Sequence, residues 1–174
     1  MYGDPTSFDL RCALAKKHNI STKNIVVGEG IDGLLGYVVR LLISEGDHVV
    51  TSNGAYPTFN YHVSGFGGNL HKVPYLADCE DIFSLIKKAH SVDSKMIFFA
   101  SPDNPMSTHV PCDMIVEALK DLPEGCLFIL DEAYSEFAPA TSLPDLAITD
   151  TKVVRLRTFS KAYGMAGARV GYAM

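Results

Sequence analysis

The sequence contains no tryptophan, no long apolar run and no cluster of basic residues. Its longest mostly apolar stretch, residues 34–43, is interrupted by Gly36 and Arg40, so no segment is expected to span a membrane. Acidic residues outnumber basic ones by 20 to 15, and this balance argues against a nucleic-acid-binding surface. The four cysteines include no Cys-x-x-Cys pair, which disfavours a disulfide framework or a zinc site and favours a cytoplasmic location.

Short aliphatic runs alternate with amphipathic stretches along all 174 residues. Most of the runs are continuously apolar, which is typical of strands that are covered on both faces. The expected strands are residues 24–28, 48–52, 70–75, 95–101, 127–131, 153–159 and 169–174, and the expected helices are 8–18, 31–44, 58–66, 82–90 and 112–122. This rhythm predicts an α/β fold, a three-layer αβα sandwich around a mostly parallel seven-stranded sheet. The last strand follows its predecessor too closely for a full crossover helix, so it is expected to run antiparallel.

Three glycines, Gly28, Gly30 and Gly33, form a Gly-x-Gly-x-x-Gly pattern between the first strand and the next helix. A dinucleotide site would also need an acidic residue at the end of the second strand, but that strand ends in Ser52 and Asn53. The hypothesis of a phosphate-binding site at this helix start remains, because free backbone N–H groups and the helix dipole both favour an anion. A plain glycine turn is the alternative.

Asp131 stands at the end of the apolar run 127–131. A nucleotide-hydrolysing site is excluded, because the chain has no Gly-x-x-x-x-Gly-Lys-Ser/Thr loop. A carboxylate in that place is costly unless it meets a cation or several donors. Asp131 is therefore either a capping residue or a carboxylate aimed at a positively charged ligand atom.

The segment 160–169 follows the sixth strand, is rich in small residues, and carries only two cations, Lys161 and Arg169. Most lone lysines are solvated, but one enclosed among small residues would have a lowered pKa and could act as an amine nucleophile. Arg169 offers a bidentate fork to a phosphate.

Taken in order, Asn104-Pro105, Asp131-Glu132-Ala133-Tyr134, and Ser160-Lys161 with Arg169 eight residues on form a specific set. With this set the chain resembles the large domain of the fold-type I pyridoxal-phosphate (PLP) enzymes. It is most similar to the histidinol-phosphate aminotransferase branch of the class I/II aminotransferases. The resemblance covers residues 1–174 and implies PLP as cofactor, amino acids and 2-oxo acids as substrates, and a homodimer.

The resemblance also implies a role for each matching residue. Lys161 would form the Schiff base with PLP and move a proton, and Asp131 would pair with the pyridine nitrogen. Tyr134 and Asn104 would hydrogen-bond the phenolic oxygen of the cofactor, and Phe59 would stack on its ring.

The phosphate of the cofactor would lie at the helix start formed by Gly30, Ile31 and Asp32. Ser160 and Arg169 would complete this phosphate site. Tyr2 matches a tyrosine that reaches the phosphate of the neighbouring subunit.

The chain departs from the family pattern in three respects. Met106 and Ser107 replace the usual Thr-Gly after Asn104-Pro105, and Ile31 replaces a small residue beside the phosphate. The chain is also about half the length of a complete aminotransferase, so we expect a fragment that lacks an N-terminal arm and a C-terminal small domain.

The expected function is amino-group transfer between an amino acid, or a histidinol-phosphate-like amine, and a 2-oxo acid. A PLP-dependent decarboxylase of a phosphorylated amino acid, or an inactive fragment, is the alternative.

Overall fold

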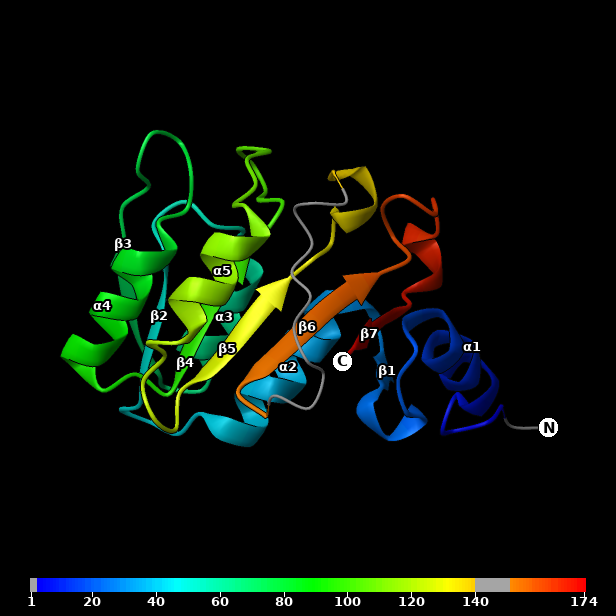
Figure 1. Ribbon diagram of the computed structural model, residues 1–174. Helices are drawn as coiled ribbons and strands as arrows, with labels where there is room; N and C mark the ends of the chain where they lie inside the picture. The colour runs from blue at the N-terminus through cyan, green and yellow to red at the C-terminus, as the bar shows by residue number, and fades with distance from the viewer. Residues whose placement is uncertain (1–2, 140–150) are drawn as a thin grey trace.

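The computed structural model describes residues 3–139 and 151–174 (Figure 1), and these form a seven-stranded sheet in the order β1-β7-β6-β5-β4-β2-β3. The strands are β1 (Val26–Gly28), β2 (His48–Ser52), β3 (Asn69–Val73), β4 (Met96–Ala100), β5 (Leu127–Asp131), β6 (Val153–Thr158) and β7 (Gly171–Ala173). β7 pairs antiparallel with both β1 and β6, whereas β3, β2, β4, β5 and β6 pair in parallel. The predicted mostly parallel sheet and the antiparallel last strand are confirmed.

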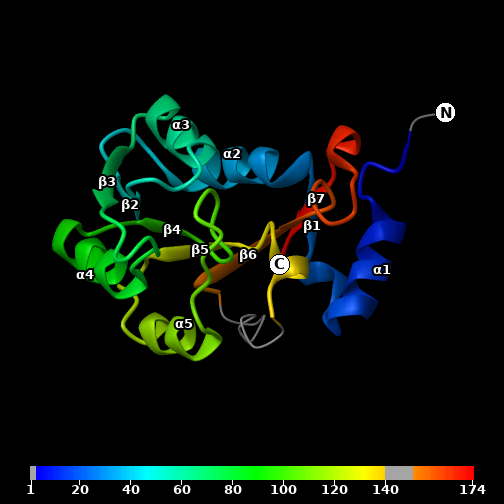
Figure 2. The same ribbon diagram turned by 90° about the horizontal axis from the view of Figure 1, so that it is seen from above.

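Five α-helices surround this sheet in the described residues: α1 (Phe8–His18), α2 (Gly30–Leu42), α3 (Thr58–Gly65), α4 (Ile82–Val92) and α5 (Cys112–Leu119). Figure 2 shows α2 and α3 over one face of the sheet and α4 and α5 over the other, which gives the expected three layers. α1 lies at one end of the molecule, beside β1 and β7. None of the helices in the described part of the chain is long and apolar enough to cross a membrane.

Strand β4 is apolar throughout, and all five of its residues are buried because both of its faces are covered. In β4, Met96 and Phe98 pack into the cluster formed with α2 and α3, whereas Ile97 and Phe99 pack into the cluster formed with α4 and α5. Successive side chains of a strand point to opposite faces, so a strand between two helical layers has no solvent-facing side.

The main departures from the predicted element boundaries lie at chain turns. The first strand begins at Val26 rather than at residue 24, because residues 22–24 form a 3-10 turn in which the Ser21 hydroxyl accepts a hydrogen bond from the Lys23 N–H. α5 ends at Leu119 rather than at residue 122, in keeping with Pro123, which disfavours helical geometry at the residue before it.

Candidate active site

A cavity of about 170 Å³ opens at the carboxyl ends of the parallel strands. Its walls come from the first turns of α2, from the segment before α3, and from the residues that end or follow β4, β5 and β6. The lining residues include Ile31, Asp32, Tyr56, Thr58, Asn104, Asp131, Tyr134, Ser160, Lys161 and Arg169. The sheet edge therefore brings together most of the predicted site residues, although up to about 140 residues separate them along the chain.

Asp131 is the last residue of β5 and is only 9% exposed. Its Oδ1 accepts a hydrogen bond of 2.9 Å from the N–H of Ala133. Burial raises the pKa of Asp131 to about 6, and Glu132 adds to the rise, whereas the Ala133 N–H and the Lys161 charge oppose it. Among the described residues no cation lies within ion-pair distance of this carboxylate. The floor of the cavity thus holds a poorly solvated carboxyl group that a positively charged ligand atom would stabilise.

Lys161 follows β6 and lines the same cavity, with its Nζ 5.2 Å from the centre of the Tyr134 ring. The residue is exposed, as are all of residues 162–168 after it, including the larger side chains of Tyr163 and Met165. The expectation of a lysine enclosed by this segment is wrong, because its alanines and glycines lack bulk and its two large side chains, Tyr163 and Met165, are themselves exposed. Lys161 and Asp131 nevertheless share one cavity, as the predicted chemistry requires.

Asn104 and Tyr134 meet on one wall of the cavity. The Asn104 Nδ2 donates a hydrogen bond to the Tyr134 hydroxyl at 3.5 Å, which joins the loop after β4 to the turn after β5. Both side chains keep further hydrogen-bonding capacity for a ligand oxygen.

Arg169 and the start of α2 form an anion cradle. The Arg169 guanidinium donates to the Glu29 carbonyl at 3.3 Å, to the Ala166 carbonyl at 3.1 Å and to the Ser160 hydroxyl at 3.5 Å. Gly30 has a φ of +76°, and a Cβ at this position would lie 2.8 Å from the Arg169 Nη2. Glycine is needed here both for the backbone conformation and for the approach of the guanidinium. The cradle combines a fixed positive charge with the free N–H groups of a helix start, which suits a phosphate.

Phe59 does not reach the cavity. Its side chain is fully buried and stacks on Phe98, with ring centroids 4.8 Å apart. Tyr56 and Thr58 line the cavity from the same segment instead. The structure therefore does not bring the predicted stacking residue to the site, because the apolar Phe59 ring takes its place in the core between α3 and β4. Tyr2 lies outside the described residues.

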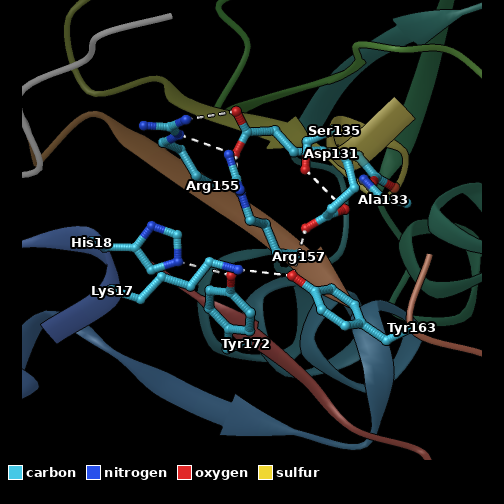
Figure 3. A network of polar contacts seen from close by, with 11 residues as sticks. Lys17, His18, Asp131, Ala133, Ser135, Arg155, Arg157, Tyr163 and Tyr172 are labelled. Carbon is cyan, nitrogen blue, oxygen red and sulfur yellow. Dashed lines mark hydrogen bonds and ion pairs between the residues drawn. The ribbon is translucent and has the colours of Figure 1, made fainter. Parts of the chain in front are cut away.

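A second set of charged residues lies on the opposite face of the sheet and was missed by the sequence analysis. Glu132 is 1% exposed, and its carboxylate accepts hydrogen bonds from Arg155 at 2.7 and 3.1 Å and from Arg157 at 3.0 Å. Figure 3 shows these two arginines extending from β6 near the His18–Tyr172 and Lys17–Tyr163 hydrogen bonds. The spacing of the arginines was an available signal, because residues two apart on a strand face the same side.

A model of the family of class I and II aminotransferases matches residues 1–174. This match covers the whole chain. The chain belongs to the class I and II aminotransferase family.

Known proteins resemble the chain in sequence and in structure. Histidinol-phosphate aminotransferase 1 of Bacillus cereus is 30% identical over 177 aligned residues, which cover 100% of this chain and 48% of the relative. The crystal structure of histidinol-phosphate aminotransferase from Sinorhizobium meliloti, in complex with pyridoxal-5'-phosphate, is 49% identical and superposes with a TM-score of 0.97 over 100% of this chain and 48% of that one. L-threonine-O-3-phosphate decarboxylase from Porphyromonas gingivalis shares the fold, with 22% identity and a TM-score of 0.85 over 100% of this chain and 53% of that one. The chain spans about half the length of the curated relatives that it matches.

Proposed function

We propose that this chain is the PLP-binding large domain of an aminotransferase that exchanges an amino group between an amino acid, or a histidinol-phosphate-like amine, and a 2-oxo acid. The observation that carries the proposal is the single cavity shared by Lys161, the buried Asp131 and the anion cradle at Arg169. This cavity supplies an amine, a carboxyl group that forms no ion pair within the described residues, and a phosphate-binding helix start. A phosphorylated pyridine aldehyde needs these three features.

The residues present fit this cofactor. Arg169, Ser160 and the N–H groups at Gly30, Ile31 and Asp32 would hold its phosphate. Asp131 would hold a proton on the pyridine nitrogen, since a buried carboxyl group with a raised pKa is stabilised by a neighbouring positive charge. When bound, PLP supplies an electron sink for the pair of electrons left at the substrate α-carbon.

The other cavity residues would orient the cofactor and move protons. Tyr134 and Asn104, already in contact with each other, would donate hydrogen bonds to the phenolic oxygen. Lys161 would hold the cofactor covalently through its Nζ, and as a free amine the same Nζ would move a proton to or from the substrate α-carbon.

The proposal includes a homodimer in a reducing, cytoplasmic compartment. Large apolar side chains are exposed on the neighbouring helices α2 and α3, among them Leu41 at 79% and Tyr61 at 71% exposure, and a dimer interface over these helices would bury them. All four cysteines are free, as expected where thiols stay reduced. Sedimentation analysis of the protein tests the dimer.

The proposed cofactor chemistry is tested by mixing the protein with PLP and reducing with borohydride. Peptide mapping should find the cofactor on Lys161 and on no other lysine, and Lys161→Ala should abolish the visible absorbance of the adduct. Adducts spread over the exposed lysines, or none at all in the folded protein, would contradict the proposal. With the full-length protein, turnover that depends on a 2-oxo acid would support transamination, whereas release of carbon dioxide would favour the decarboxylase alternative.

A further inference from the structure

The start of α2 carries two carboxylates, Glu29 and Asp32, beside the anion cradle. Of the two side chains, that of Asp32 lines the cavity, whereas Glu29 is not among the lining residues. A carboxylate next to a bound phosphate is unfavourable, because like charges repel and the carboxylate competes for the same guanidinium. Asp32, whose side chain is 55% exposed, is therefore the carboxylate that could disturb a phosphate bound in the cradle.

His62 supplies a partner for this carboxylate from the neighbouring helix α3. Its Nε2 donates to the Asp32 Oδ1 at 3.0 Å. The imidazole ring lies against Gly36 of α2, where a Cβ would be 3.0 Å from the His62 Cε1 and 3.3 Å from its Nδ1. The absence of a side chain at Gly36 thus leaves the space in which the ring reaches Asp32.

We propose that His62 is a positioning residue for the phosphate subsite: its Nε2–H holds the Asp32 carboxylate in place, so that this carboxylate does not compete with a phosphate for the cradle at Arg169. This inference rests on the proposed function, because it assumes a ligand whose phosphate occupies the cradle. Without His62, the freed carboxylate would repel the phosphate and compete with it for Arg169.

The test compares PLP with pyridoxal, which has the same aldehyde and ring but no phosphate. The affinity of each for Lys161 is measured from the absorbance of the adduct. His62→Ala should weaken PLP binding by about tenfold, or about 1.4 kcal/mol, because the Asp32 carboxylate would no longer be held by an N–H donor and could repel the phosphate and bind Arg169. Pyridoxal binding should change by less than about twofold, because no phosphate is present to feel the freed charge.

Two further variants separate charge from packing. In the His62→Ala background, Asp32→Asn should restore PLP binding to within about twofold of the original protein, since it removes the charge itself. His62→Gln, which keeps an N–H donor, should lose less affinity than His62→Ala. Equal losses for PLP and pyridoxal, or no rescue by Asp32→Asn, would show that His62 only supports the fold.

Tyr37→Phe provides a matched control. The Tyr37 hydroxyl donates to the Glu29 Oε2 at 2.9 Å, so this variant frees the other carboxylate of the same helix turn. The ratio of PLP to pyridoxal affinity should stay unchanged, and an equal fall in this ratio would contradict a specific role for His62. A protein that forms no adduct with either aldehyde would contradict the proposed function together with this inference. Adducts with both aldehydes and a ratio insensitive to His62→Ala would contradict the inference alone.

Discussion

Asp131 and Glu132 are neighbours in sequence and are both buried, yet they lie in opposite electrostatic surroundings. Glu132 faces the layer away from the cavity and is bound by two arginines of β6. Asp131 faces the cavity and has one backbone N–H as its hydrogen-bond partner among the described residues. Burial alone does not tell a structural carboxylate from one that awaits a ligand. The difference lies in whether the protein itself supplies the compensating charge.

Removing the compensated carboxylate should have the largest effect. Glu132→Ala leaves Arg155 and Arg157 largely buried without their partner, and we expect the free energy of unfolding to fall by about 3–5 kcal/mol. Urea denaturation followed by circular dichroism measures this change. Glu117→Ala, which removes an exposed ion pair with Lys120, is the matched control and should cost less than about 1 kcal/mol. Similar losses in the two variants would show that the Glu132 network is not a special contribution to stability.

Replacing Asp131, the carboxylate without a compensating charge, should raise the free energy of unfolding instead of lowering it. The pKa of Asp131 rises from 3.8 to about 6 on folding, so its contribution to stability is present below pH 3.8 and is lost as the pH rises through 6. Asp131→Asn should therefore stabilise the cofactor-free protein by up to about 3 kcal/mol at pH 8, and the gain should vanish near pH 4. Urea denaturation at pH 4, 6 and 8 provides the measurement. A variant that is less stable than the original protein at pH 8 would contradict an uncompensated Asp131. Asp131→Asn should also weaken PLP binding. A variant that is more stable but binds the cofactor less tightly would show that Asp131 is retained for function at a cost in stability.

The smallest effect on stability is expected for the cation on the cavity side. Lys161 is exposed and makes no close ion pair in the described residues, so Lys161→Ala should change the free energy of unfolding by less than about 0.5 kcal/mol. Thermal denaturation without cofactor measures this. A large loss of stability would show that Lys161 already compensates Asp131 in the empty cavity.

The residues that the sequence analysis placed correctly share a topological position. Asn104, Asp131, Tyr134 and Lys161 end or follow parallel strands, and the carboxyl ends of such strands meet at one edge of the sheet. Phe59 could not be placed in this way. It lies within a helix beyond a loop, and which of its neighbours faces the cavity depends on how α3 packs on the sheet. The His62–Asp32 contact was equally out of reach, because it joins two helices through side chains with no sequence pattern in common.

The sequence by itself determined the layered α/β fold, the parallel central strands and the set of residues at their carboxyl ends. These follow from local properties, namely apolar runs, helical periodicity and the short link before the last strand. Only the tertiary structure decided which charges are compensated. In the register of β5 and β6, Leu130 lies beside Arg155, and Asp131 lies beside Leu156. The two arginines of β6 therefore face the side of the sheet on which Glu132 lies. The residue of β6 beside Asp131 is a leucine, which offers the carboxylate no positive charge. The partners of a buried charge depend on strand register and helix packing, which no local sequence pattern encodes.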